Sequence, residues 1–276
     1  MIVGIGAETY LFTSGIRTKN IIKLSDSVTL LPASPCSSLD NLSSLVHSDL
    51  DFSIVVLNLP RISSQLHVKA NDEKELAMIA WNAQWDCILL GAVFDCEVIC
   101  NLQSDRPIEE SRKFQYLNIT NYSFRVITNN IYTLTIDDEK WILSNYEAAR
   151  CLLDSDGFLT AVHSMATYRW HSLPRVQMAI IWSGIEALFD VSSEISFRLS
   201  FYIALYLSDD REEASKLFSK VRELYKYRSL SVHGNKLKAD IFYCVKESAM
   251  ILNRLIRRCA ERKGLPNTDD LLFKKL

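Results

Sequence analysis

The sequence predicts an α+β N-terminal domain over residues 1–135, followed by an all-α antiparallel helical bundle over residues 136–276. Three observations support this fold class. The first half of the chain mixes short strand-like runs with one long helical segment. From Asp137 onward, apolar residues recur at steps of three and four almost to the C-terminus. The segments with this helical period are joined by short connections, as antiparallel helices are.

The first 135 residues contain several strand-like runs and one helix. Apolar or alternating runs predict strands at 53–59, 65–69, 97–102, 114–120, 124–128 and 131–135. We expect the last two to form a hairpin across Asn129-Asn130. Asp72 and Glu75 form a capping box that opens a helix to about Leu90. The Ser- and Pro-rich segment 32–50 predicts a loop.

The second half of the chain reads as six helices. Their apolar periods predict helices at 138–153, 158–171, 174–190, 194–207, 209–232 and 239–263. Pro174 suits the first turn of the third helix. Ser208-Asp209-Asp210 places capping and acidic side chains at the start of the fifth. Gly234 and Asn235 suit its C-terminal cap.

The amino-acid composition limits the classes of protein to which this chain can belong. With 276 residues, 48% hydrophobic and 23% charged, the chain suits a soluble protein of one large or two ordinary domains. No run of eighteen uncharged apolar residues occurs and no signal peptide is evident, so we expect no membrane partner. Seven cysteines without framework spacing indicate free thiols in a reducing cytoplasm. Cys96 and Cys100 lack a second ligand pair, so we predict no metal and no cofactor.

An arginine interrupts the apolar stripe of the fifth helix. The stripe is formed by Ala214, Leu217, Phe218, Val221, Leu224 and Tyr225. Its next position is Arg228, whose permanent charge requires an anionic partner or a ligand. Glu186 and Arg198 are likewise isolated charges in apolar helices, so we expect all three to meet along a polar seam. The alternative is an arginine at the core edge, paired with a carboxylate and extending to water.

Three segments carry a family resemblance. They are WSGIEALF at 182–189, EISFRLS at 194–200 and LYKYRSLSVHG at 224–234. Together they resemble the Apea-like branch of the HEPN superfamily, whose signature is Arg, four to six residues, then His. Arg228 and His233 fit this signature with four residues between them. The resemblance covers roughly residues 140–262 and departs from many ribonuclease members at Ser229, where they have Asn, Asp or His.

The resemblance implies a metal-independent endoribonuclease of a bacterial stress-response or phage-defence type. His233 would be the general acid or base, and Arg228 would hold the scissile phosphate. Glu186, Arg198 and Ser229 would position that arginine. RNA contacts are expected from residues flanking the motif, namely Lys226, Asn235, Lys236 and Lys238. The products would end in a 2′,3′-cyclic phosphate.

Helix geometry bears on how the two motif residues act together. Five residues advance an α-helix by ~500°, so Arg228 and His233 would point ~140° apart in an uninterrupted helix. Either the helix ends near Val232, or two chains supply the groups together. The resemblance favours the second, because HEPN ribonucleases generally build one site from two protomers. A homodimer or higher homo-oligomer is therefore expected.

Two basic runs have two interpretations. Residues 216–238 contain seven Lys and Arg against Glu223 alone, and residues 254–263 contain five against Glu261 alone. These are either solvated helix faces or phosphate-binding surfaces. The net charge of −2 alone argues against a general nucleic-acid binder. The alternative function is a non-catalytic HEPN module that dimerises and binds RNA or protein, which Ser229 and the acidic first half favour. The N-terminal half could be a sensor or a regulatory domain.

Overall fold

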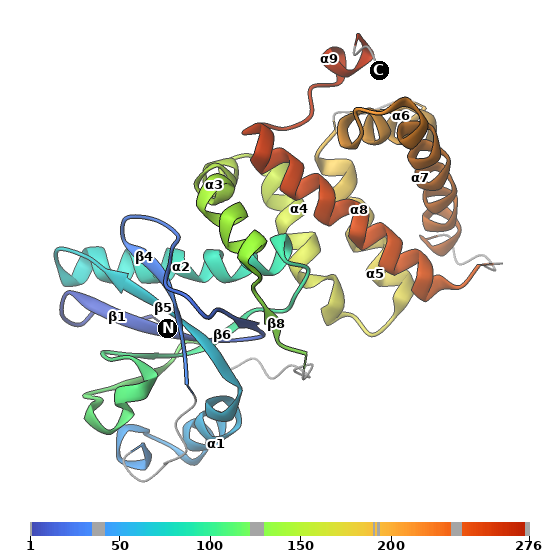
Figure 1. The fold of residues 1–276 in the computed structure, drawn as a ribbon. Coiled ribbons are helices and arrows are strands. Elements are labelled where there is room, and N and C mark those ends of the chain that lie inside the picture. Colours follow the sequence, from blue (N-terminus) through green and yellow to red (C-terminus); the bar gives the residue numbers. More distant parts are fainter. Residues whose placement is uncertain are drawn as a thin grey trace. The chain divides into compact units, whose positions relative to one another are not determined.

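A computed structural model describes residues 2–34, 42–121, 130–189, 191, 194–232 and 239–273. The chain is α+β, with an antiparallel sheet followed by a helical region, as the sequence predicts (Figure 1). It forms two compact units, one of residues 1–91 and 96–147, the other of residues 92–95 and 148–276. The division thus falls inside helix α3 (Ile136–Leu152), whereas the sequence pattern places it just before that helix.

The first unit is built on a six-stranded sheet in the order β3-β4-β5-β1-β6-β7, antiparallel throughout. The central strand, β1 (Glu8–Ser14), pairs with β5 (Ile62–Lys69) on one side and β6 (Ile99–Ser104) on the other. The outer strands are β4 (Val28–Pro32), β3 (Ile22–Lys23) and β7 (Leu117–Ile119). The sequence patterns predicted β5, β6 and β7 but not the central strand.

A second, short ladder contains part of the segment expected to form a hairpin. β8 (Tyr132–Thr133) pairs in parallel with β2 (Ile16–Arg17). The expected partner strand, 124–128, lies outside the described residues. The pairing that is seen for the 131–135 segment is therefore a long-range one, which a local turn signal at Asn129-Asn130 could not predict.

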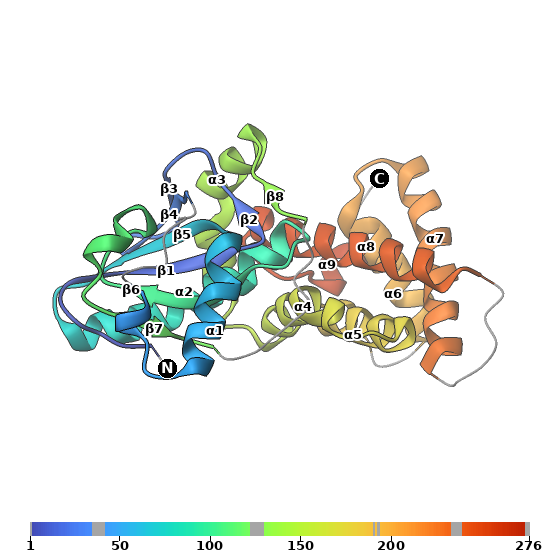
Figure 2. The same ribbon diagram turned by 90° about the horizontal axis from the view of Figure 1, so that it is seen from below.

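Apolar side chains cover both faces of the sheet. On one face, helix α1 (Asp49–Asn58) contributes Ile54 and Val55 to a core that also contains Tyr10 and Phe12 of β1. Helix α2 (Glu73–Val93) runs along the other face (Figure 2). The predicted cap at the start of α2 is present, since Asp72 Oδ1 accepts from Glu75 N at 2.8 Å.

The strand predicted at 53–59 is wrong, because this segment is helical. It forms most of α1 and then a 3₁₀ turn, Leu59–Arg61. Ser48 caps the helix by accepting from Asp51 N at 3.1 Å, and two aspartates lie in its first turn. The periodicity of a short apolar run fits a buried strand and a buried helix equally well. Here the Ser48 cap, which precedes the run, favours the helix.

Helix α2 has the length and mean hydropathy of a membrane-spanning helix, and it is the one such helix among the described residues. Within the fold, 56% of its apolar window is buried. Core helices of soluble proteins pass the same test, so the signal is weak evidence for a membrane span. α2 also carries Asp86, which is buried and accepts from the Tyr146 hydroxyl at 3.1 Å.

The second unit consists mainly of helices, at positions close to those predicted. After α3 come α4 (Asp156–Thr167), α5 (Pro174–Ala187), α6 (Ile195–Leu207), α7 (Arg211–Val232), α8 (Ile241–Arg262) and the short, unpredicted α9 (Thr268–Leu272). Pro174 occupies the first turn of α5, as expected. Asp210 caps α7 by accepting from Glu213 N at 2.8 Å. The predicted C-cap residues Gly234 and Asn235 lie outside the described residues.

Helix α5 is central to this unit. It packs against α4, α7 and α8. Its Trp182 is fully buried, and the indole Nε1 donates to Ser248 Oγ of α8 at 3.0 Å. A buried tryptophan needs a partner for its N–H, and this one ties α5 to α8 in the core.

Candidate functional site

An ion pair between α5 and α7 marks the candidate site. Nη2 of Arg228 lies 3.0 Å from Oε1 and 3.1 Å from Oε2 of Glu186. The side chains are 24% and 31% exposed, so the pair sits at the core edge rather than deep inside. Both sequence alternatives gave Arg228 a carboxylate partner; the structure identifies it as Glu186 and leaves the pair open to solvent on one side.

Two aromatic side chains, Tyr225 and Trp182, connect Arg228 to the core. The Arg228 guanidinium lies over the ring of Tyr225, 5.6 Å from its centroid. Tyr225 in turn contacts Trp182 edge to face, with centroids 5.2 Å apart. Because Trp182 is anchored to Ser248, Arg228 is connected through two rings to the rigid interior of the unit.

Burial governs the electrostatics of this cluster. It raises the pKa of Glu186, and the charge of Arg228 opposes that rise only in part. Burial also raises the pKa of Tyr225, with a further contribution from the Glu186 charge. Nε of Arg228 is buried, and no hydrogen-bond partner for it is seen among the described residues. The guanidinium therefore keeps unused hydrogen-bonding capacity beside its ion pair.

Arg198 does not join this cluster in the part of the chain that the structure describes. Its side chain is 48% exposed, and its Nε lies 3.4 Å from Oε2 of Glu194, one turn earlier. It lies in the first turn of α6, where neighbouring Phe197 is also exposed, rather than on the buried face of that helix. A single charge in an apolar segment suggested burial, but the apolar side chains around it are themselves partly in solvent.

The other predicted site residues fall into two groups. Lys226 is exposed and Ser229 is half-buried, and neither contacts the Arg228–Glu186 pair in any interaction seen here. Helix α7 is described as far as Val232, and the residues that follow, 233–238, lie outside the described part of the chain, so neither alternative for the end of this helix is tested. The remaining predicted residues lie outside the described residues; they are His233, Asn235, Lys236 and Lys238.

The second basic run is largely neutralised. Arg258 lies 2.9 Å from Asp209, and Arg262 lies 3.7 Å from the same carboxylate. Arg254 lies 3.5 Å from Glu213. Asp209 lies two residues before α7 and Glu213 lies in its first turn, so the spacing within 254–263 could not reveal them. The interpretation of this run as solvated, internally paired charge is favoured.

The first basic run keeps free positive charge near the site. Lys216 and Lys220 pair with Glu212 and Glu247 respectively. Arg222 and Lys226 are exposed, and no ion pair is seen for either across the described ranges. Of these two, Arg222 lies near the middle of α7 and Lys226 lies two residues before Arg228, so positive charge without a visible ion pair reaches the part of the helix that carries Arg228.

One contact near the site had no sequence signal. Arg175, in the first turn of α5, donates from Nη1 to the backbone carbonyl of Ser231 at 3.3 Å. An arginine directly after Pro174 shows no period or motif that links it to position 231. Only the packing of α5 on α7 brings them together.

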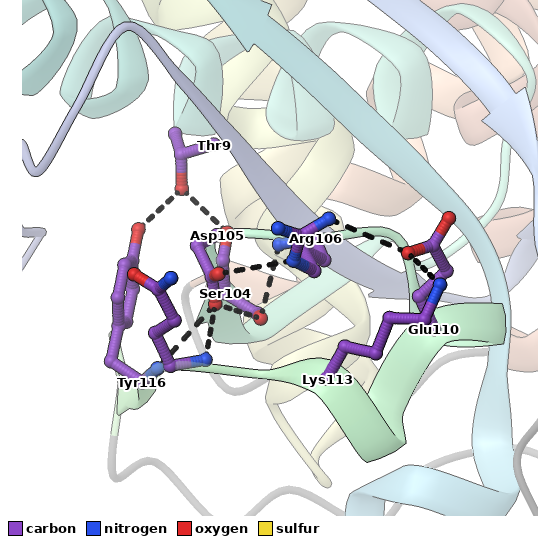
Figure 3. Close-up of polar contacts among 8 residues, drawn as sticks. Thr9, Ser104, Asp105, Arg106, Glu110, Lys113 and Tyr116 are labelled. Carbon is purple, nitrogen blue, oxygen red and sulfur yellow. Dashed lines mark hydrogen bonds and ion pairs between the residues drawn. The ribbon is translucent and has the colours of Figure 1, made fainter.

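The first unit holds a separate polar cluster that organises a connection between strands. Figure 3 shows Arg106 between two carboxylates; it lies 3.6 Å from Asp105 and 3.5 Å from Glu110. Asp105 Oδ1 also accepts from Gln115 N at 2.9 Å, and Lys113 lies 3.2 Å from Glu110. The cluster's charges are paired with one another, and its contacts help to hold the β6–β7 connection in place.

Comparison with protein-family models, curated proteins and solved structures finds no match to this chain. Among the described residues, no group of three or more His, Cys, Asp or Glu side chains could hold a metal ion. The functional interpretation therefore rests on the geometry around Arg228 and on the sequence motif.

Proposed function

We propose that the second unit is a HEPN-like antiparallel bundle and that the protein is a metal-independent endoribonuclease of a stress-response or phage-defence type. The observation that carries this proposal is the setting of Arg228. It occupies the core-facing stripe of α7, is held by Glu186 and Tyr225, and stays partly exposed. An arginine fixed in this way at a solvent-open edge is suited to hold a phosphate, and His233 follows five positions later.

The proposed chemistry uses the nucleophile of RNA itself. The ribose 2′-hydroxyl attacks the neighbouring phosphorus, and the 5′-oxygen of the next nucleotide leaves, which gives a 2′,3′-cyclic phosphate. His233 takes or supplies a proton, since imidazole titrates near neutral pH. Arg228 stabilises the charge that builds on the phosphate oxygens. Glu186 holds Nη2 of Arg228 and so orients the guanidinium toward the phosphate.

The proposed RNA-binding surface surrounds the end of α7. Lys226, which is exposed, would contact the RNA backbone, as would Asn235, Lys236 and Lys238. A homodimer would bring two such ends together and complete the site. Ser229 would adjust the position of Arg228, and the first unit would regulate the activity in the cytoplasm by sensing an unknown trigger.

Incubation of the purified chain with a mixed RNA substrate, with and without EDTA, tests the proposal. We expect cleavage that persists in EDTA, is abolished in Arg228→Ala and in His233→Ala, and yields cyclic phosphate ends. Arg254→Ala is the matched control, since this arginine is paired with Glu213 in α7. Activity retained in His233→Ala would refute the catalytic assignment.

A second candidate function is a non-catalytic module that dimerises or binds RNA or protein. The observation that favours it is an apolar groove of 330 Å³ lined by α6 and α7. Phe197 is one of the lining residues; its ring centroid lies 6.2 Å from that of Phe201 and 5.6 Å from that of Phe218, and it is 52% exposed. RNA binding without cleavage, unaffected by His233→Ala, would support this module over the nuclease.

A further inference from the structure

The end of α7 is held by α5 at three points on one helix face. Tyr225 contacts Trp182, Arg228 pairs with Glu186, and the Ser231 carbonyl accepts from Arg175. The three α7 residues are spaced three apart, so they lie on one side of that helix. All three partners belong to α5, from its first turn to its last. One helix thus fixes the last two described turns of the other.

The contact to Ser231 has a specific physical role. Ser231 lies in the last described turn of α7, and a backbone carbonyl oxygen can accept from a nearby cation as well as from a backbone N–H. Ser231 is buried, so its carbonyl has little access to water. A guanidinium N–H from Arg175 supplies both the hydrogen bond and the charge. This contact lies three residues beyond Arg228 and stabilises the turn that follows it.

We infer that Arg175 is a positioning residue for the candidate site, and this inference rests on the proposed function. By holding the Ser231 carbonyl, it keeps the last turn of α7 formed and the Arg228 guanidinium directed at one phosphate position. Without that contact the turn frays, and Arg228 samples several orientations relative to the bond to be cleaved. A small misplacement of a catalytic group costs rate more than it costs binding.

A direct contact between Arg175 and the RNA backbone is the competing explanation. It predicts a different kinetic effect, because loss of a phosphate contact weakens binding and reduces the salt dependence of affinity. The positioning role predicts a lower kcat with KM nearly unchanged. Two conservative variants of Arg175 distinguish the positioning role from a direct RNA contact, because they differ in charge. Arg175→Lys keeps both donor and charge, whereas Arg175→Gln keeps a donor without the charge.

The kinetic test compares these variants with the wild type on a single RNA substrate. For Arg175→Ala we expect kcat to fall about tenfold to a hundredfold with KM within about twofold. Lys and Gln at this position should each recover part of kcat. Arg169→Ala is the matched control, since Arg169 also donates to a backbone carbonyl, that of Asp95 at 3.0 Å, away from α7. A raised KM with unchanged kcat, and rescue by Lys alone, would overturn the inference.

Hydrogen–deuterium exchange tests the same inference without any activity. Backbone amides in residues 224–232 should exchange faster in Arg175→Ala than in the wild type or Arg169→Ala, while the amides of α8 stay protected. Exchange in 224–232 that does not change would overturn the positioning role. If the wild type cleaves no RNA, the proposed function fails, and faster exchange in this segment still supports the contact as the element that orders the end of α7.

Discussion

Nη2 of Arg228 lies almost equally far from the two carboxylate oxygens of Glu186, at 3.0 and 3.1 Å. This pair joins α5 to α7 at the edge of the core and fixes one side of the guanidinium. It also places the Glu186 carboxylate where burial raises its pKa. The pair therefore links the stability of the helical unit to the chemistry proposed for it.

Removal of the carboxylate should destabilise the protein. In Glu186→Ala the Arg228 guanidinium keeps its charge but loses its partner in a half-buried position. Fully buried pairs cost ~3–5 kcal/mol when one partner is removed, and exposed pairs cost ~0–1 kcal/mol. We expect a loss of about 1–3 kcal/mol, measured by chemical denaturation. Glu212→Ala, which breaks the exposed pair with Lys216, is the control and should change stability little.

The pair should also make stability depend on pH. Burial raises the pKa of Glu186 above its ordinary value of 4.5, so the folded protein holds this proton more tightly than the unfolded chain does. The stabilisation from protonation is complete below the ordinary pKa and is lost as the pH rises through the raised pKa. Glu186→Gln cannot titrate. The melting temperature of the wild type minus that of Glu186→Gln should therefore decrease as the pH rises above the ordinary pKa of 4.5, and an increase would contradict the raised pKa.

Lysine should not replace the motif arginine. An ammonium can pair with Glu186, but it lacks the planar guanidinium that grips two phosphate oxygens and lies over the Tyr225 ring. We expect Arg228→Lys to keep a near-native melting temperature and to lose most RNA cleavage. Cleavage rates on one substrate, measured beside the melting curves, check both parts. Near-native activity of Arg228→Lys would show that only a positive charge is needed there.

The sequence patterns predicted the long helices well because their apolar periods are strong and their caps are local. They also singled out Glu186 and Arg228, since isolated charges in apolar stripes must find partners. The sequence patterns could not predict contacts between residues that lie far apart in the sequence. The neutralisation of Arg258 by Asp209 connects residues far apart in sequence. A short apolar run has no distinctive period, so the sequence of α1 predicts a strand as readily as a helix. No sequence pattern links Arg175 to the candidate site.

The pairing of the second basic run leads to a prediction about RNA affinity. Arg258 is already close to Asp209, so its charge contributes little to attracting RNA, whereas Lys226 is exposed without an ion pair seen among the described residues. We expect Lys226→Ala to weaken RNA binding and to reduce the slope of log affinity against log salt by about one. Arg258→Ala should leave that slope unchanged. Equal effects from the two variants would show that both faces bind RNA.

The last prediction concerns the number of chains in a site. Arg228 and a residue five positions later diverge by ~140° on a continuous helix, so one chain does not readily direct both groups at one phosphate. We expect a dimer, with the 228–234 segments facing each other. Sedimentation at tens of micromolar protein should show it. If two protomers share the site, mixing inactive Arg228→Ala with inactive His233→Ala should restore part of the cleavage, because each mixed dimer carries one intact arginine and one intact histidine on opposite protomers. A monomer under these conditions, or no recovery in mixtures proven to exchange subunits, would contradict the shared site and require both groups to act from a single chain.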